Sequence, residues 1–344
     1  MTTMKYPVLL DDSTIGITPV SNGIFSEAED MFNQAFKRME ERGFKIVLNE
    51  DIWGQEKARA ASAEKRAAGL ADMMADPNID VIMPPWGGHL ALEILEHLDF
   101  DTLQVKWLTG YSDISTILLA ITLKTGIATA HMANIVDLRG RHMDKVTARW
   151  LDVLSCQQGA QIIQTSSERY QLEWDHEHPT DIVFNLTEKT KWKAVDEKGQ
   201  DLSEARFEGR VLGGCIDTMR HLIGTSYGDI PAFREKHTEG EDVLWYIDVS
   251  ELDTVDLKRS LTQMKYAGWF ESTAGLIFGR VGKPSVKEDY TYKNVYQDIA
   301  RELGKPVIYD VDFGHKPPQM AIINGAYGMI EMIEDKGQLI QRFK

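Results

Sequence analysis

Residues 105–126 read VKWLTGYSDISTILLAITLKTG, and this segment decides the fold class. Its apolar start, Val105–Leu108, predicts a buried strand, and Ile114–Lys124 predicts a helix that ends at Gly126. A strand that runs through a short loop into a helix is the unit from which parallel sheets are built. The segment therefore predicts an α/β protein, and in such proteins ligands bind beyond the carboxyl ends of the strands.

The same alternation extends back to the start of the chain. Further strands are predicted at Thr14–Thr18, Phe44–Leu48 and Ile79–Met83, and helices at Ser26–Arg42, Lys57–Ala75 and His89–Leu98. Strands that recur at intervals of about 30 residues indicate βαβ units. Residues 1–165 are therefore expected to form a flavodoxin-like domain around a parallel sheet.

The pattern changes at residues 166–181, which read SSERYQLEWDHEHPTD and are polar without a period. We place the crossover between two domains there. Residues 182–344 contain shorter apolar runs and are expected to form a mixed, barrel-like α/β domain. The strands predicted there are Ile182–Leu186, Val243–Val249, Leu276–Gly279 and Pro306–Tyr309, and the helices are Gly214–Ile223 and Asp256–Ala267.

Charge and cysteine content exclude several classes of protein. The 344 residues carry 53 Asp and Glu against 38 Lys and Arg, a net charge of −15. Such a balance argues against binding nucleic acid or an anionic membrane, both of which need a basic face. Two cysteines cannot form a disulfide framework, and no apolar segment reaches about 18 residues. The residues Met1–Asp12 do not resemble a signal peptide, so none is expected. We expect a cytoplasmic protein whose partner is a small molecule or peptide.

Three loops carry candidate chemistry. Ser112 lies between the predicted strand and helix, where a helix N-terminus favours an oxyanion, although it could instead merely cap the helix. Gly87 and Gly88 follow another strand and let backbone N–H groups approach a ligand, unless they form an ordinary turn. His315 lies between Gly314 and two prolines, either as a rigidly held general base or as a solvated loop residue. No zinc or nucleotide-phosphate signature is present, so no metal and no cofactor are expected.

Taken together, these loops resemble the LD-carboxypeptidase family of serine peptidases, which includes the microcin C immunity peptidases. The resemblance extends along nearly the whole chain, with six motifs in the family's order. They are Asp12–Ser21, Lys65–Leu70 with Asp76–Ile82, Trp86–Gly88, Gly110–Ile114, Gly209–Cys215 with Leu222–Tyr227, and Gly314–Pro318.

The resemblance implies a catalytic triad. Ser112 would be the nucleophile and His315 the general base, with the backbone N–H groups of Gly88 and Asp113 as oxyanion donors. The family usually has Glu as its acid at the end of a strand, but an ungapped alignment places Ile247 there and Asp248 one residue later.

A shift of one residue reverses the face of a strand to which a side chain points. A bulge or loop shift could bring Asp248 to His315, Glu251 could serve instead, or the triad could be incomplete. We choose Asp248. Cys215, which stands where the family has Asn, is a second departure and affects a local hydrogen bond.

The resemblance also implies hydrolysis of an amide next to a free carboxylate. The length of the chain favours a microcin-immunity type of substrate, a peptidyl or aminoacyl group joined to a nucleotide-like moiety. Gly87 would then contact the substrate and Trp192 would stack on its base, unless Trp192 packs within its own domain. The alternatives are a muramoyl tetrapeptide of cell-wall recycling, or a binding protein that has lost catalysis. A homodimer is expected by analogy, and a carboxylate substrate requires a locally basic group in this acidic chain.

Overall fold

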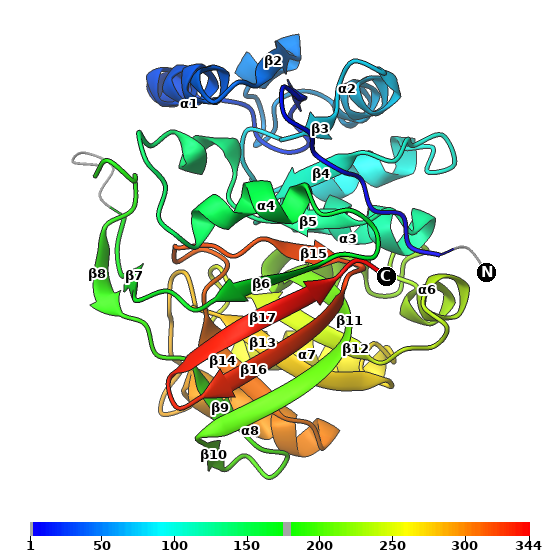
Figure 1. Ribbon diagram of the computed structural model, residues 1–344. Coiled ribbons are helices and arrows are strands. Elements are labelled where there is room, and N and C mark those ends of the chain that lie inside the picture. Colours follow the sequence, from blue (N-terminus) through cyan, green and yellow to red (C-terminus); the bar gives the residue numbers. More distant parts are fainter. Residues whose placement is uncertain (1–2, 175–179) are drawn as a thin grey trace.

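The structure is a computed structural model that describes residues 3–174 and 180–344. Two sheets are stacked in it, with helices above and between them (Figure 1). The first sheet has six strands in the order β15-β5-β4-β3-β1-β2. Strands β1 to β5 run parallel, and β15 joins the edge antiparallel to β5. The strands are β1 (Thr14–Ile17), β2 (Lys45–Leu48), β3 (Val81–Ile82), β4 (Trp107–Gly110), β5 (Thr129–His131) and β15 (Ile322–Asn324).

Helices cover this sheet and separate it from the second. The helix α3 contacts both β5 and β11 of the second sheet, and residues 114–123 are all buried. A helix buried on every side needs apolar residues all round, which explains the run ILLAI in its centre. The helices of this half are α1 (Glu29–Glu41), α2 (Ala63–Ala75), α3 (Ile114–Thr125) and α4 (Trp150–Leu154), with 3₁₀ turns at Ser26–Ala28, Glu50–Trp53, Ala91–His97, Ile135–Leu138 and Thr147–Arg149.

The second sheet has nine strands in the order β10-β9-β14-β13-β12-β11-β16-β17-β6 and curls into a half-barrel (Figure 1). Its central strands β11 to β14 are parallel, so their carboxyl ends lie at one edge. The strands are β6 (Gln161–Thr165), β9 (Lys193–Val195), β10 (Asp201–Leu202), β11 (Glu204–Cys215), β12 (Val243–Asp248), β13 (Thr273–Gly279), β14 (Val307–Val311), β16 (Tyr327–Ile333) and β17 (Lys336–Arg342).

The remaining elements lie around the half-barrel. A separate hairpin is formed by β7 (Arg169–Gln171) and β8 (Leu186–Lys189). The helices are α5 (Ile216–Met219), α6 (Ile230–His237), α7 (Thr254–Tyr266) and α8 (Tyr292–Leu303), with a 3₁₀ turn at Arg220–Leu222. None of the helices in the described part of the chain has the length and apolarity needed to span a bilayer.

The predicted fold class is confirmed: a parallel-rich sheet is joined to a mixed, barrel-like sheet. Three predicted elements were wrong in detail. The helix expected from Lys57 begins only at Ala63, because the Ser62 side chain accepts a hydrogen bond from Lys65 N–H and caps it there. The helix predicted at His89–Leu98 is a 3₁₀ turn at Ala91–His97. The strand predicted at Ile182–Leu186 is mostly irregular, and only its last residue belongs to β8.

The division of the chain at residues 166–181 stays a prediction, and residues 175–179 of that crossover lie outside the described residues. Each sheet contains one strand that comes from the other side of this crossover in the sequence. Strand β6 precedes the crossover yet pairs with β17 of the second sheet, whereas β15 follows it and pairs with β5 of the first. The chain therefore passes from one sheet to the other three times, between β5 and β6, between β14 and β15, and between β15 and β16. These connections hold the carboxyl edges of the two sheets against each other.

Candidate active site

Ser112 lies at a strained turn between β4 and α3. Its backbone φ is 65°, in the left-handed region that residues with a side chain rarely adopt. The side chain is partly buried, and its Oγ lies 3.1 Å from Nε2 of His315. A serine held at such a strand-to-helix turn has the geometry of a nucleophile elbow.

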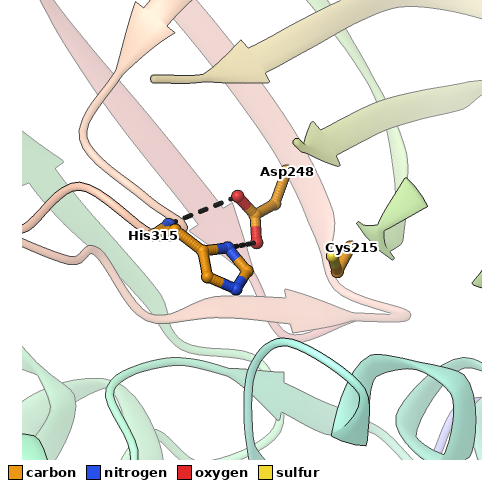
Figure 2. Close-up of side chains that lie close together, drawn as sticks. All are labelled: Cys215, Asp248 and His315. Atoms are coloured by element: carbon orange, nitrogen blue, oxygen red, sulfur yellow. Dashed lines mark hydrogen bonds and ion pairs between the residues drawn. The ribbon is translucent and has the colours of Figure 1, made fainter. Parts of the chain in front are cut away.

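His315 and Asp248 form a close pair (Figure 2). Nδ1 of His315 lies 2.8 Å from Oδ2 of Asp248, and the backbone N–H of His315 donates to Oδ1 at 3.3 Å. Gly314 has a φ of 87°, and a Cβ there would lie 2.1 Å from Oδ1 of Asp248. Only glycine therefore lets the loop after β14 approach the carboxylate this closely.

Side chains along β12 point alternately to its two faces, and this explains which carboxylate reaches His315. Trp245 and Ile247 pack in one core, whereas Tyr246 packs in the other and its ring lies 5.9 Å from that of Phe313. Asp248 shares the face of Tyr246, and Phe313 is two residues before His315. Glu251, the alternative acid, instead forms an ion pair with Lys283 at 2.5 Å.

The pKa values of the pair support mutual charge stabilisation. Burial alone would raise the pKa of Asp248, but the charge and hydrogen bonds of His315 outweigh it and bring the pKa below its usual value. Burial would lower the pKa of His315, but Asp248, with smaller contributions from Asp217 and Asp137, raises it above 6.5. The site therefore stabilises an imidazolium next to a carboxylate.

The loop after β3 lies directly against Ser112. A Cβ at Gly87 would be 2.7 Å from Cβ of Ser112 and 3.0 Å from the backbone nitrogen of Asp113. A Cβ at Gly88 would be 2.4 Å from Oγ of Ser21. Neither glycine could carry a side chain without displacing these neighbours, so the loop brings its backbone to the nucleophile.

The carboxylate of Asp113 anchors this arrangement. It is buried and accepts hydrogen bonds from Oγ of Ser21 at 2.6 Å and from the backbone N–H of Ala91 at 2.8 Å. Burial raises the pKa of Asp113, although both hydrogen bonds oppose that rise. The side chain thus ties the loops after β1, β3 and β4 together, which the sequence did not predict.

Two pockets meet at Ser112 and together form the cleft. The larger, of about 490 Å³, is lined by Cys215, Asp217 and His221. The smaller, of about 290 Å³, is lined by His315, Lys283, Lys316, Leu172 and Trp174, and both include Gly88 and Glu251. Lys316 lines the smaller pocket and forms no ion pair within residues 3–174 and 180–344, so it is a candidate for the basic group that is expected from the sequence.

The structure does not bring Trp192 to the cleft. Its side chain is 1% exposed, and its indole N–H donates to Oδ2 of Asp312 at 3.0 Å. A Cβ at Gly337 would lie 2.2 Å from the ring. The expected stacking of Trp192 on a substrate is therefore corrected: the residue packs in the core of the second sheet.

Cys215, Asp248 and His315 are the group of possible metal ligands found among the described residues, with ligand atoms within 4.8 Å of one another (Figure 2). The imidazole and carboxylate atoms already face each other. Burial, with Asp248 and Asp217 nearby, raises the pKa of the Cys215 thiol well above its usual value. A thiol is a poor metal ligand compared with a thiolate, so the chemistry of this group favours acid–base work.

Comparisons with known proteins place this chain among the LD-carboxypeptidases. Two family profiles match the chain: the LD-carboxypeptidase N-terminal domain at residues 15–132 and the LD-carboxypeptidase C-terminal domain at residues 208–330. The microcin C7 self-immunity protein MccF of Escherichia coli is 24% identical over 326 residues, which cover 92% of this chain and 89% of that protein.

Solved structures share the whole fold. The structure of MccF in complex with glutamyl sulfamoyl guanosine has a TM-score of 0.83 at 18% identity and covers 99% of both chains. Muramoyltetrapeptide carboxypeptidase from Oxalobacter formigenes has a TM-score of 0.72 at 16% identity, covering 96% of this chain and 99% of that one. At such identities the structural likeness establishes the fold.

Proposed function

Because the chain belongs to the LD-carboxypeptidase family, we propose that it is a serine carboxypeptidase-type amide hydrolase with Ser112, His315 and Asp248 as its triad. One observation carries the proposal. An unbroken line of contacts runs from Oγ of Ser112 to Nε2 of His315 at 3.1 Å, and from Nδ1 to Asp248 at 2.8 Å. The binding-protein alternative was based on a missing acid, and a buried carboxylate in contact with the imidazole argues against it.

In the proposed reaction His315 removes the proton of Ser112 as Oγ attacks the carbonyl carbon of the amide. The oxygen that becomes negative accepts hydrogen bonds from the backbone N–H groups of Gly88 and Asp113. His315 then gives its proton to the leaving amine, and water attacks the acyl-enzyme by the same route. Asp248 holds the imidazole with Nδ1–H towards it and stabilises the imidazolium.

The oxyanion role predicts that Gly87→Ala lowers kcat/KM by about 100-fold or more. The new methyl group would displace Ser112 or the amide of Asp113, because it would lie within 3.0 Å of both. Steady-state kinetics and thermal melting measure the loss and the integrity of the fold. Gly159→Ala is the control: a Cβ there meets nothing within 4 Å and the residue does not line the cleft, so its φ of 88° should cost stability while kcat/KM stays at the wild-type level. Unchanged kinetics of Gly87→Ala would contradict the role of this loop.

For the substrate we propose an aminoacyl or peptidyl group joined by an amide to a nucleotide-like moiety. Support comes from the likeness to MccF, whose structures include complexes with glutamyl sulfamoyl guanosine and aspartyl sulfamoyl adenosine. Lys316 and Lys283 would bind the free carboxylate, and Trp174 offers an aromatic ring in the same pocket. The homodimer and the cytoplasmic location belong to the same proposal.

A direct competition of substrates tests this proposal. The protein is incubated with glutamyl sulfamoyl adenosine and with a muramoyl tetrapeptide, and mass spectrometry identifies the products. We expect cleavage of the nucleoside compound, and none of either compound by Ser112→Ala. Cleavage of the tetrapeptide alone would replace our substrate by that of cell-wall recycling. Binding without cleavage of either would favour a binding protein.

A further inference from the structure

A separate pocket of about 480 Å³ lies next to the cleft, and we call it the lysine pocket. It is formed by β9, β14, the loop after β13 and the first turn of α8. Lys316 lines both this pocket and the smaller pocket of the cleft. Although the chain has a net charge of −15, the lysine pocket contains six basic side chains and one acidic side chain, Asp310. The basic residues are Lys189, Lys191, Lys193, Arg280, Lys293 and Lys316.

Half of these positive charges have acidic partners. Lys193 pairs with Asp310 and Lys293 with Asp201, both at 2.8 Å, and Arg280 pairs with Asp312 at 2.7 Å. The other three, Lys189, Lys191 and Lys316, form no ion pair within the described part of the chain. Three ammonium groups around one pocket repel each other, and a bound anion would remove that repulsion.

Arg280 is a second, independent feature that favours an anion in this pocket. The residue is only 4% exposed, and its Nη1 is buried with no hydrogen-bond partner among the residues that the structure describes. The guanidinium carbon lies 4.3 Å from the ring centre of Tyr170, which also lines the pocket. A buried guanidinium nitrogen without an acceptor costs free energy that a ligand oxygen could recover.

The pKa of the neighbouring Lys316 is lowered, and burial is the main cause. Among its charged neighbours, Glu173 and Asp310 raise this pKa, whereas Arg280 lowers it. An anion between Lys316 and Arg280 would favour the charged form of the lysine.

We propose that the lysine pocket binds a phosphorylated small molecule. A phosphate carries up to two negative charges and several acceptor oxygens, which suits three unpaired ammonium groups better than one carboxylate does. The first turn of α8 adds the positive end of a helix dipole, since Thr291 caps the helix and lines the pocket. Tyr292, Tyr296 and Tyr309 also line it and suit the sugar or ring that carries the phosphate. The binding does not require the reaction at Ser112, but it shares Lys316 with the cleft, where that lysine is proposed to bind the substrate carboxylate.

Isothermal titration calorimetry of the full chain with inorganic pyrophosphate, at low ionic strength, tests the proposal. We expect saturable binding that Lys189→Gln/Lys191→Gln weakens by at least about tenfold, because two of the three unpaired charges are lost. Both side chains are exposed, so the fold should be kept, and thermal melting checks this. Lys189→Arg/Lys191→Arg preserves the charge and should retain most of the affinity.

The matched control is Lys37→Gln/Lys65→Gln, which removes the same net charge from exposed positions on α1 and α2. It should bind pyrophosphate like the wild type. The proposal is overturned if the wild type shows no saturable binding at millimolar pyrophosphate, or if the control loses as much affinity as the pocket variant. Equal binding of acetate would overturn the assignment to phosphate.

Discussion

Ser112→Ala is expected to lower kcat/KM for the amide substrate by about 10⁴-fold or more. The variant lacks the oxygen that forms the acyl-enzyme, so the residual rate comes from binding and from the oxyanion donors alone. Alanine tolerates the backbone φ of 65° about as well as serine does, and the thermal midpoint should therefore change little. Kinetics at saturating and limiting substrate measure the loss.

Ser115→Ala is the matched control for this experiment. Ser115 lies in the first turn of α3, is buried, and has its Oγ 3.4 Å from Nδ1 of His131. Removal of the Ser115 hydroxyl should lower the free energy of unfolding but leave kcat within a few-fold of the wild type. Hydrolysis that survives in Ser112→Ala, with Ser115→Ala unaffected, would show that Ser112 is not the nucleophile.

Local patterns predicted the first half of the fold well, because parallel strands and their helices repeat along the chain. Strand β15 could not be predicted in this way. It is short, lies near the end of the chain, and pairs antiparallel with β5 almost 200 residues earlier, as the register Ile322 to His131 shows. Its place in the first sheet depends on tertiary packing, which no local pattern encodes.

The positions of Ser112 and His315 were predictable because both follow strands whose carboxyl ends meet in the fold. The role of Asp248 does not follow from the alignment, because an ungapped alignment places Ile247 at the family's acid and Asp248 on the opposite face of the strand. The structure brings it to His315 through the loop after β14, where Gly314 leaves room for the carboxylate. Backbone approach of this kind can be recognised only after folding.

The sequence around Trp192 already contains a pattern that indicates a buried side chain. Residues 189–194 read KTKWKA, and their side chains alternate between exposed and buried, with every lysine exposed and Trp192 buried. That period of two is typical of a half-buried strand. The lysines that flank Trp192 made it resemble a surface aromatic, yet these same lysines form the lysine pocket on the other face.

Asp248→Asn is expected to lower kcat/KM by about 10³ to 10⁴-fold near neutral pH, because the amide no longer selects the active tautomer of His315. Its pH profile should also change. In the wild type, activity depends on neutral His315 and is lost as the pH falls through a pKa that Asp248 holds above 6.5. Without that carboxylate, burial lowers the pKa of His315. The acid limb of the profile, where kcat/KM falls as the pH is lowered, should therefore move to lower pH. Profiles of kcat/KM between about pH 5 and 9 measure the shift.

The direction of that shift separates a catalytic partner from a structural one. A substitution that only loosened the fold would reduce activity at every pH without moving the acid limb, since the pKa of His315 depends on its charged neighbours. Glu251→Gln is the control, because Glu251 was the alternative acid and pairs with Lys283 instead. Because Glu251 lines the cleft and pairs with Lys283, its loss should change KM, but kcat should stay within a few-fold and the acid limb of kcat should stay in place. If Glu251→Gln moves the limb and Asp248→Asn does not, Glu251 is the acid and the contact of Asp248 with His315 is structural.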